Sequence, residues 1–272
     1  MKLPTRSVLV VIAVLVVAGF VASLGLGSIV KRAIEGEGTK SLSLSTTVSR
    51  AHVSLLGGKL KLSELRIASP RGFSAPQMLE LGNVGIAVHY GELRRDPVHI
   101  DSLTLDRPRL VIEQSNGAVN FRKAMDLQPA GDPGKPPMKV VIGELKMEDA
   151  QVVIRPGLPG VAQEIVVPVP SLTLRNVGQG QGAKNGAAIK EVAMQVIAAL
   201  AGSAAQSGAL PAPLKALLNV DVAAVAGKLG AEARKQIAAA LPGEAGATLS
   251  KAVQDPAALA KDPVQALQGL KK

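Results

Sequence analysis

The chain has 272 residues, enough for one large domain or two small ones, and it is basic, with 31 Lys and Arg against 21 Asp and Glu. It contains no Cys, which excludes disulfides, thiolate metal sites and a lipidated cysteine. The positive excess lies at the two ends of the chain, and Trp is absent. Clustered basic residues with stacking aromatics are typical of nucleic-acid binding, so we expect no nucleic-acid partner.

An apolar run without any charged residue extends from Ser7 to Val30. Its 24 residues exceed the roughly 20 that a helix needs to span a bilayer. We therefore predict a single-pass anchor that contacts the membrane through residues 7–30. The alternative is a cleaved signal peptide, but its apolar core would have only about 7–15 residues.

Downstream of the run, residues 33–40 predict a polar, Gly-rich hinge, and from Lys40 the apolar residues recur with a period of two. Such alternation predicts half-buried strands. The segment from Leu127 to Lys139 is rich in Pro and Gly and predicts a loop between two halves of a sheet. The predicted strands cover Ser41–Val48, Lys59–Leu62, Val84–Tyr90, Arg109–Gln114, Gln151–Arg155 and Glu164–Val169.

From about Lys184 the composition shifts to Ala, Leu, Gln and Lys, and the apolar period becomes helical. The apolar residues between Ile189 and Leu200 have the spacing of one helix face. This helix is predicted to cover the open face of the sheet, and the alternative is that it lies on a membrane or binds a partner. The Gly-rich segment Asn176–Gly186 predicts a linker from sheet to helices, because it lacks the order of a phosphate-binding loop.

A repeat of about 40 residues runs through the central region. Each copy has an apolar residue followed by apolar residues three and five positions later. Three positions along a strand reach the opposite face, so the pattern predicts a bulge or tight turn within each copy. Stacked copies would form an elongated sheet with one continuous apolar face. The aligned residues are Leu62, Leu65 and Ile67, then Ile100, Leu103 and Leu105, then Ile142, Leu145 and Met147.

The central region resembles the AsmA-like family of bacterial envelope proteins over about residues 7–125. Ser69 stands where the family pattern has Asn. The resemblance implies an anchor in the bacterial inner membrane, with most of the chain in the periplasm and lipid as the ligand. The matching residues are Ile34-Glu35, Leu65, Ile67, Pro70, Gly72, Phe73, Leu81-Gly82, Val98, Ile100, Leu103, Leu105, Pro108, Gly117, Asn120 and Phe121.

The predicted fold class is mainly β with α. It combines an N-terminal transmembrane helix, an elongated, mostly antiparallel repetitive β-sheet and a small Ala-rich helical C-terminal region. The predicted domains are a membrane anchor (1–32), a repetitive β domain (33–183) and a helical region (184–272). Phe73 is interpreted as a cap on the apolar face, or alternatively as the lining of a ligand groove. The candidate lipid-facing residues are Leu62, Leu65, Ile67, Phe73, Ile100, Leu103 and Leu105.

Three functions are consistent with this sequence. The first is a non-enzymatic protein that shields or transfers lipid acyl chains along the apolar sheet face in envelope maintenance. The second is a structural scaffold that positions other envelope proteins. The third is a metal-dependent hydrolase at His89, His99 and Asp101, since imidazole and carboxylate bind several divalent metals. We favour the first, and predict no catalytic residue, no resident metal and no cofactor.

Overall fold

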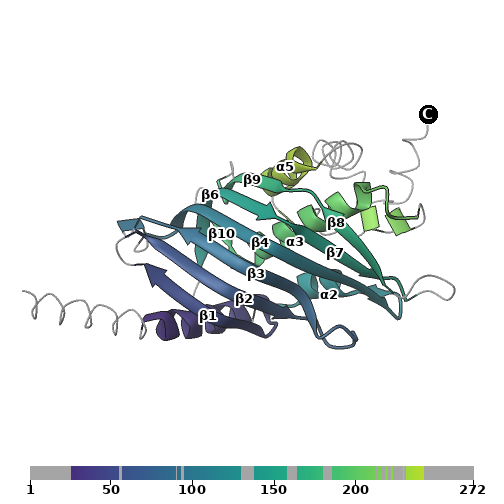
Figure 1. Cartoon of the computed structure of the whole chain (residues 1–272), viewed down its shortest axis with the longest axis horizontal. Helices are drawn as coiled ribbons and strands as arrows, with labels where there is room; N and C mark the ends of the chain where they lie inside the picture. The colour runs from purple at the N-terminus through teal and green to yellow at the C-terminus, as the bar shows by residue number, and fades with distance from the viewer. Residues whose placement is uncertain are drawn as a thin grey trace, which may run out of the picture.

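The alternating segments form one large sheet, with helices against one face and along one edge (Figure 1). The computed structural model describes residues 26–54, 57–89, 91–92, 95–129, 138–157, 164–179, 186–211, 214–215, 218–219, 222, 229 and 231–241. The strands are β1 (Thr46–Ser54), β2 (Lys59–Ala68), β3 (Gln77–Ala87), β4 (Val98–Ser115), β5 (Ala118–Val119), β6 (Lys139–Glu148), β7 (Ala150–Arg155), β8 (Ile165–Val169), β9 (Leu172–Val177) and β10 (Ala187–Ala188). The helices are α2 (Asn120–Asp126), α3 (Ile189–Gln206), α5 (Ala231–Ala240) and residues 26–42, here called the N-terminal helix. The mainly β architecture is confirmed.

The strands follow the order β1-β2-β3-β4-β6-β10, with β7 beside β4, β8 beside β7 and β9 beside β6. β4 is parallel to β6 and β7, and the other pairs between described strands are antiparallel. Among the described strands, seven of the nine pairs are antiparallel, as predicted for most of the sheet, and the two parallel pairs at β4 make the sheet mixed. The register gives the reason. The second and third copies of the repeat lie side by side, with Ile100 opposite Ile142 and Leu103 opposite Leu145.

The apolar side chains of the strands point to the inner face of the sheet, which faces the helices. Leu62, Leu105 and Leu145 are 1%, 3% and 0% exposed. Leu65 and Leu103 are half-buried and pack against the same core, so the aligned leucines of the repeat share one face, as predicted. Burying a leucine side chain fully contributes about 1.5–3 kcal/mol. The inner face is therefore the main source of stability.

A line of residues that we call the crease interrupts the strand ladders across the sheet. It comprises Ser49, Glu64, Gly82, Arg107 and Asp149, which the register of neighbouring strands leaves out. Glu64, Arg107 and Asp149 have φ values of 51°, 52° and 52°, in the left-handed region. This backbone shift lets Leu62 and Leu65, three residues apart, both face the core. The bulge predicted from the repeat is thus confirmed for its first copy.

A second interruption crosses β4, β6 and β9 at Asp101, Gly143 and Asn176. Asn176 has a φ of 54°. Gly143 lies so close to β4 that an added Cβ would be 2.8 Å from the carbonyl oxygen of Asp101. Any other residue at position 143 would have to displace backbone, and backbone yields less readily than a flexible side chain.

We expect Gly143→Ala to lower the free energy of unfolding by about 1–3 kcal/mol, the usual effect of overpacking. Gly85→Ala is the matched control, because its added Cβ would meet only the Cβ of Thr104, at an ordinary 3.8 Å. Denaturant unfolding of both variants measures the difference. Equal stability of the two variants would contradict the close approach at Gly143.

The N-terminal helix lies along β1, which is an edge strand of the sheet (Figure 1). Thr39 Oγ1 accepts the N–H of Thr46 at 3.0 Å, and Glu35 Oε1 accepts the N–H of Val48 at 2.8 Å. Lys31 Nζ donates to the carbonyl of Ser49 at 3.4 Å. Four helix residues rise about 6 Å and two strand residues about 6.6 Å, so helix positions four apart match strand positions two apart. The helix thereby occupies hydrogen-bonding groups that an edge strand would otherwise expose.

This helix corrects two predictions from the sequence. Residues 33–40 are helical and form no hinge, because the side chains of Glu35 and Thr39 bind the edge strand. The strand predicted from Ser41 begins at Thr46. Most of the predicted anchor, residues 7–25, lies outside the described residues, and residues 26–30 belong to the N-terminal helix. Within the described part of the chain, no helix is both long enough and apolar enough to cross a membrane.

We expect Glu35→Ala to lower the free energy of unfolding by about 1–3 kcal/mol, because the N–H of Val48 would lose its acceptor in a partly buried position. Glu35→Gln keeps an acceptor oxygen, so its free energy of unfolding should fall clearly less. Denaturant unfolding of the full chain in detergent measures both. A Gln variant as unstable as the Ala variant would show that the charge, and not the hydrogen bond to β1, stabilises the fold.

Helix α3 covers part of the inner face, as predicted for Ile189–Leu200. It contacts β4, β7, β8 and β10, and every residue from Met194 to Ala205 is buried. Helix α5 lies against β9 and α3, where Gln236 Nε2 donates to the carbonyl oxygen of Asn176 at 2.8 Å. Residues 130–137 and 180–185, within the loop and linker predicted above, lie outside the described residues.

Candidate functional site

The inner face changes from half-buried to buried along β4. Val98, Ile100 and Leu103 are half-buried, whereas Leu105, Leu110 and Ile112 are 3%, 0% and 5% exposed. We call the end of the sheet where β1 meets β2 the hairpin end, and the opposite end, where β2 meets β3, the loop end. The helices therefore cover the inner face of β4 fully at the loop end and incompletely at the hairpin end.

The half-buried residues at the hairpin end form one surface across three strands, which we call the apolar patch. Ile86 on β3 lies opposite Leu60 on β2 and opposite Leu103 on β4. Val98 and Ile100 extend the patch along β4, and all five residues pack against the core with one side. The strand backbone beneath is paired in the ladders, so the patch offers apolar contact and few hydrogen-bonding groups. Such a surface suits an apolar ligand.

The structure places only two of the seven candidate lipid-facing residues in this patch, namely Ile100 and Leu103. Leu62, Ile67 and Leu105 are 1%, 6% and 3% exposed within the core, so a ligand would reach them only if the helices moved. Leu65 is half-buried on β2 beyond the crease. Sequence reasoning missed Leu60, Ile86 and Val98. Their alternation is visible in the sequence, but the pairing of Leu60 with Ile86 depends on the register.

Phe73 lies at the loop end, away from the patch. It sits in the segment between β2 and β3, half-buried, with Lys123 Nζ of α2 5.8 Å from the centre of its ring. Lys123 Nζ also donates to the carbonyl oxygen of Arg71 at 2.9 Å. Phe73 therefore contacts Lys123 on α2. It does not belong to the apolar core that the described residues form.

A buried carboxylate fixes this segment. Glu113 on β4 is 6% exposed and accepts the N–H groups of Ser74 and Ala75, both at 2.7 Å. Burial by itself would raise the pKa of Glu113, but these hydrogen bonds and the charge of Arg155 outweigh it and hold the pKa below the usual range. Asn120, fully buried, accepts the N–H of Glu113 and donates to Val111. The Asn120-Phe121 pair and the Pro-x-Gly-Phe segment of the resemblance are thus parts of one structural corner.

Because its folded-state pKa is lowered, Glu113 stabilises the fold fully above the carboxyl's ordinary pKa, and this contribution is lost as the pH falls through the folded-state pKa. We expect Glu113→Gln to lower the free energy of unfolding at pH 7 by about 1–3 kcal/mol and to make stability less dependent on pH between about 5 and 3. Glu164→Gln, which removes two partly exposed ion pairs, with Arg155 and Arg109, should change stability by about 1 kcal/mol or less. A Glu113→Gln variant with unchanged acid sensitivity would refute this role.

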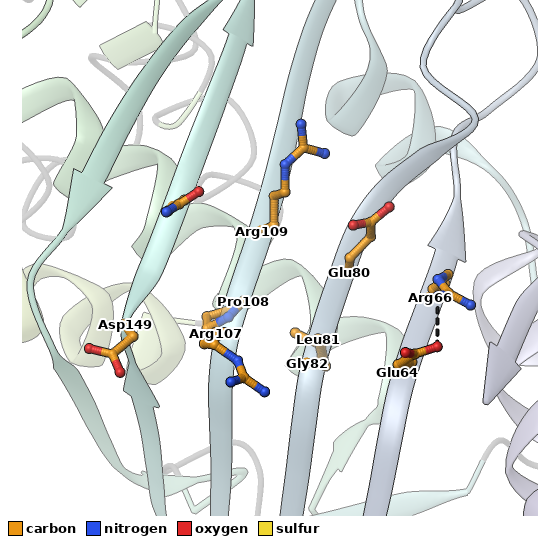
Figure 2. Close-up of a pocket in the computed structure, with 10 residues that line it drawn as sticks. Glu64, Arg66, Glu80, Leu81, Gly82, Arg107, Pro108, Arg109 and Asp149 are labelled. Carbon is orange, nitrogen blue, oxygen red and sulfur yellow. Dashed lines mark hydrogen bonds and ion pairs between the residues drawn. The ribbon is translucent and has the colours of Figure 1, made fainter. Parts of the chain in front are cut away.

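The outer face of the sheet is charged, and a hollow of about 470 Å³ lies over the crease. Figure 2 shows Glu64, Arg66, Glu80, Arg107 and Arg109 around it, and Gly82 also lines it. Arg66 binds Glu64 at 2.8 Å. A hydrogen bond from Ser49, and then the charge of Arg66, lower the pKa of Glu64. This hollow is open and is lined by charged side chains of both signs, so it does not suit an acyl chain.

The structure brings together two of the three residues considered for a metal site. His89 Nδ1 lies 2.7 Å from Asp101 Oδ2, with both side chains well exposed. Among the described residues, no group of three or more His, Asp or Glu side chains is arranged to hold a metal ion. The pair therefore has the character of a surface interaction.

Comparison of the chain with protein-family models, with curated proteins and with solved structures gave no significant match. The AsmA-like resemblance therefore stays a prediction based on the sequence motifs.

Proposed function

We propose that this chain is a non-enzymatic, AsmA-like envelope protein that shields or transfers lipid acyl chains at the apolar patch. In this proposal the apolar run anchors it in the bacterial inner membrane, with the bulk of the chain in the periplasm. One observation carries the proposal: the apolar patch lies at the end of the sheet where the apolar run joins the fold. An added Cβ on Gly27 would lie 2.4 Å from the carbonyl oxygen of Ala51, three residues before the end of β1.

The energetics of such a site are favourable. An acyl chain gains about 0.8 kcal/mol for each methylene group that it buries, so eight methylenes contribute roughly 6 kcal/mol. The patch spans three strands, and neighbouring strands are about 4.8 Å apart. A surface of this size can cover a segment of one acyl chain, and it leaves the rest in the membrane or on a partner.

The scaffold function is the second candidate, and the burial of the inner face beneath α3 favours it. A sheet whose apolar face is covered by its own helices has little need of a ligand at the loop end. The two functions differ at the hairpin end, where the scaffold predicts no bound lipid. A test must therefore probe the apolar patch itself.

We expect a photo-reactive amino acid at Leu60 to form lipid adducts in intact bacterial cells, because this position lies half-buried in the patch. The matched control is the same amino acid at Val166, which is 50% exposed on β8. Mass spectrometry of the purified full chain should show lipid adducts at position 60 at least several-fold above those at position 166.

Lipid adducts at neither position, in a chain that remains in the membrane fraction, would favour the scaffold. Equal labelling at both positions would mean that the probe reports general contact with lipid and not the patch. As a second readout, Leu60→Asn with Ile86→Asn should reduce the lipid that co-purifies with the chain, since both side chains are only half-buried and tolerate polarity better than core residues.

A further inference from the structure

The outer face at the hairpin end carries a group of cationic residues that the proposed function does not use. Arg50 and His52 on β1 and Lys59 and Lys61 on β2 are all exposed. His52 lies opposite Lys61, and Lys59 lies opposite Ser54, so the four residues share one surface, which we call the basic hairpin. With His52 neutral, its formal charge is +3.

The neighbouring side chains do little to neutralise this charge. Gly85 and Ala87 on β3 lie opposite Lys61 and Lys59, and neither carries a charge. Glu64, three residues after Lys61 on β2, binds Arg66 at 2.8 Å and accepts a hydrogen bond from Ser49 at 2.7 Å. Arg50 is close enough to lower the pKa of Glu64, but its effect ranks below those of Ser49 and Arg66. Both lysines thus face water without an acidic partner among the described residues.

The position of the N-terminal helix along β1 relates the basic hairpin to the apolar run. The contacts pair Thr39 with Thr46, Glu35 with Val48 and Gly27 with Ala51, so the helix runs antiparallel to β1. The apolar run up to Leu26, the residue before this closest approach, has 20 residues, which is the length that a bilayer span requires. If that part spans, the edge of the hydrocarbon core lies near the level of Ala51. Arg50 and the pair formed by His52 and Lys61 are within about one residue of that edge, from which a long lysine side chain reaches the lipid headgroups.

We propose that the basic hairpin docks on an anionic phospholipid surface and so holds the sheet against the membrane beside its anchor. This inference rests on the membrane location in the proposed function, although it does not require that the apolar patch binds lipid. Juxtamembrane lysines near an anionic bilayer contribute through charge attraction that fades within a Debye length. The basic hairpin lacks aromatic residues for base stacking, which makes an anionic membrane a better partner than nucleic acid.

The test uses the full chain in nanodiscs of phosphatidylcholine, with or without 30% phosphatidylglycerol. The chain has no Cys, so Gly85→Cys offers a single labelling site between Lys61 and Thr104, where an added Cβ meets only ordinary contacts. A fluorophore there should be quenched by headgroup spin labels more strongly in the anionic discs. The same label on Ala118→Cys, exposed at the loop end, should show little quenching in either disc.

Lys59→Gln with Lys61→Gln should reduce quenching at position 85 to its level in neutral discs. The control of equal charge change is Arg71→Gln with Lys235→Gln, two exposed cations away from the basic hairpin, and it should keep the quenching. A high-salt buffer should reduce the quenching at position 85 as the lysine substitutions do, because salt screens the charge attraction.

Equal quenching in neutral and anionic discs, or an equal loss in both double variants, would overturn the inference. A short DNA duplex that binds the wild-type chain through the same lysines more tightly than anionic vesicles do would assign the surface to nucleic acid and also overturn it. A full chain that does not enter nanodiscs at all would instead refute the anchor of the proposed function. The failures of the two proposals can therefore be distinguished.

Discussion

The whole sheet depends on a change of side-chain direction partway along its strands. In a long strand with strict alternation of apolar and polar residues, the strand twist gradually turns the apolar face away from the helices that cover it. Here Glu64 in β2, Arg107 in β4 and Asp149 between β6 and β7 adopt left-handed backbone conformations, and with Gly82 of β3 they lie on one line, so the direction changes together across the sheet. A left-handed residue costs about 1–2 kcal/mol. Because the shift keeps Leu62 and Leu65 on one face, burial of apolar residues on both sides of the crease offsets that cost.

The N-terminal helix solves a second problem, which is how to end a sheet without a free edge. Its side chains at positions 31, 35 and 39 bind the groups that a further strand would have paired. At the other side of the sheet, Pro168 within β8 and Pro170 after it lack N–H donors, and prolines of this kind are tolerated on edge strands. The edge at β1 and the part of the opposite edge formed by β8 therefore disfavour the addition of strands from another chain. In the proposed function, the helical conformation of residues 33–40 also couples the orientation of the anchor to the orientation of the sheet.

The sequence predicted parts of β1, β2, β3, β4, β7 and β8, the bulge within the repeat and the covering role of α3, because each follows from local periodicity. It also aligned Ile100 with Ile142 and Leu103 with Leu145, which are true neighbours in the sheet. It failed where a long-range contact decides the outcome. Residues 33–40 have two glycines and read as a hinge, yet Glu35 and Thr39 bind β1 and stabilise a helix. Three of the five residues of the apolar patch were missed for the same reason. The sequence shows the alternation but not the register that places Leu60 opposite Ile86.

The extent of the patch follows from the composition of the covering helix. From Met194 to Ala205, α3 is dominated by small residues, and Ala198, Ala199, Ala201, Ala204 and Ala205 are each at most 1% exposed. Small side chains allow a close approach to β4 and β7, and this seals the loop end tightly. They reach less far sideways, and α3 contacts none of β1, β2 and β3 extensively among the described residues. Among the described residues, the inner face of β2 and β3 at the hairpin end thus lacks a covering helix of this kind, and in the proposed function an apolar ligand from the membrane complements it.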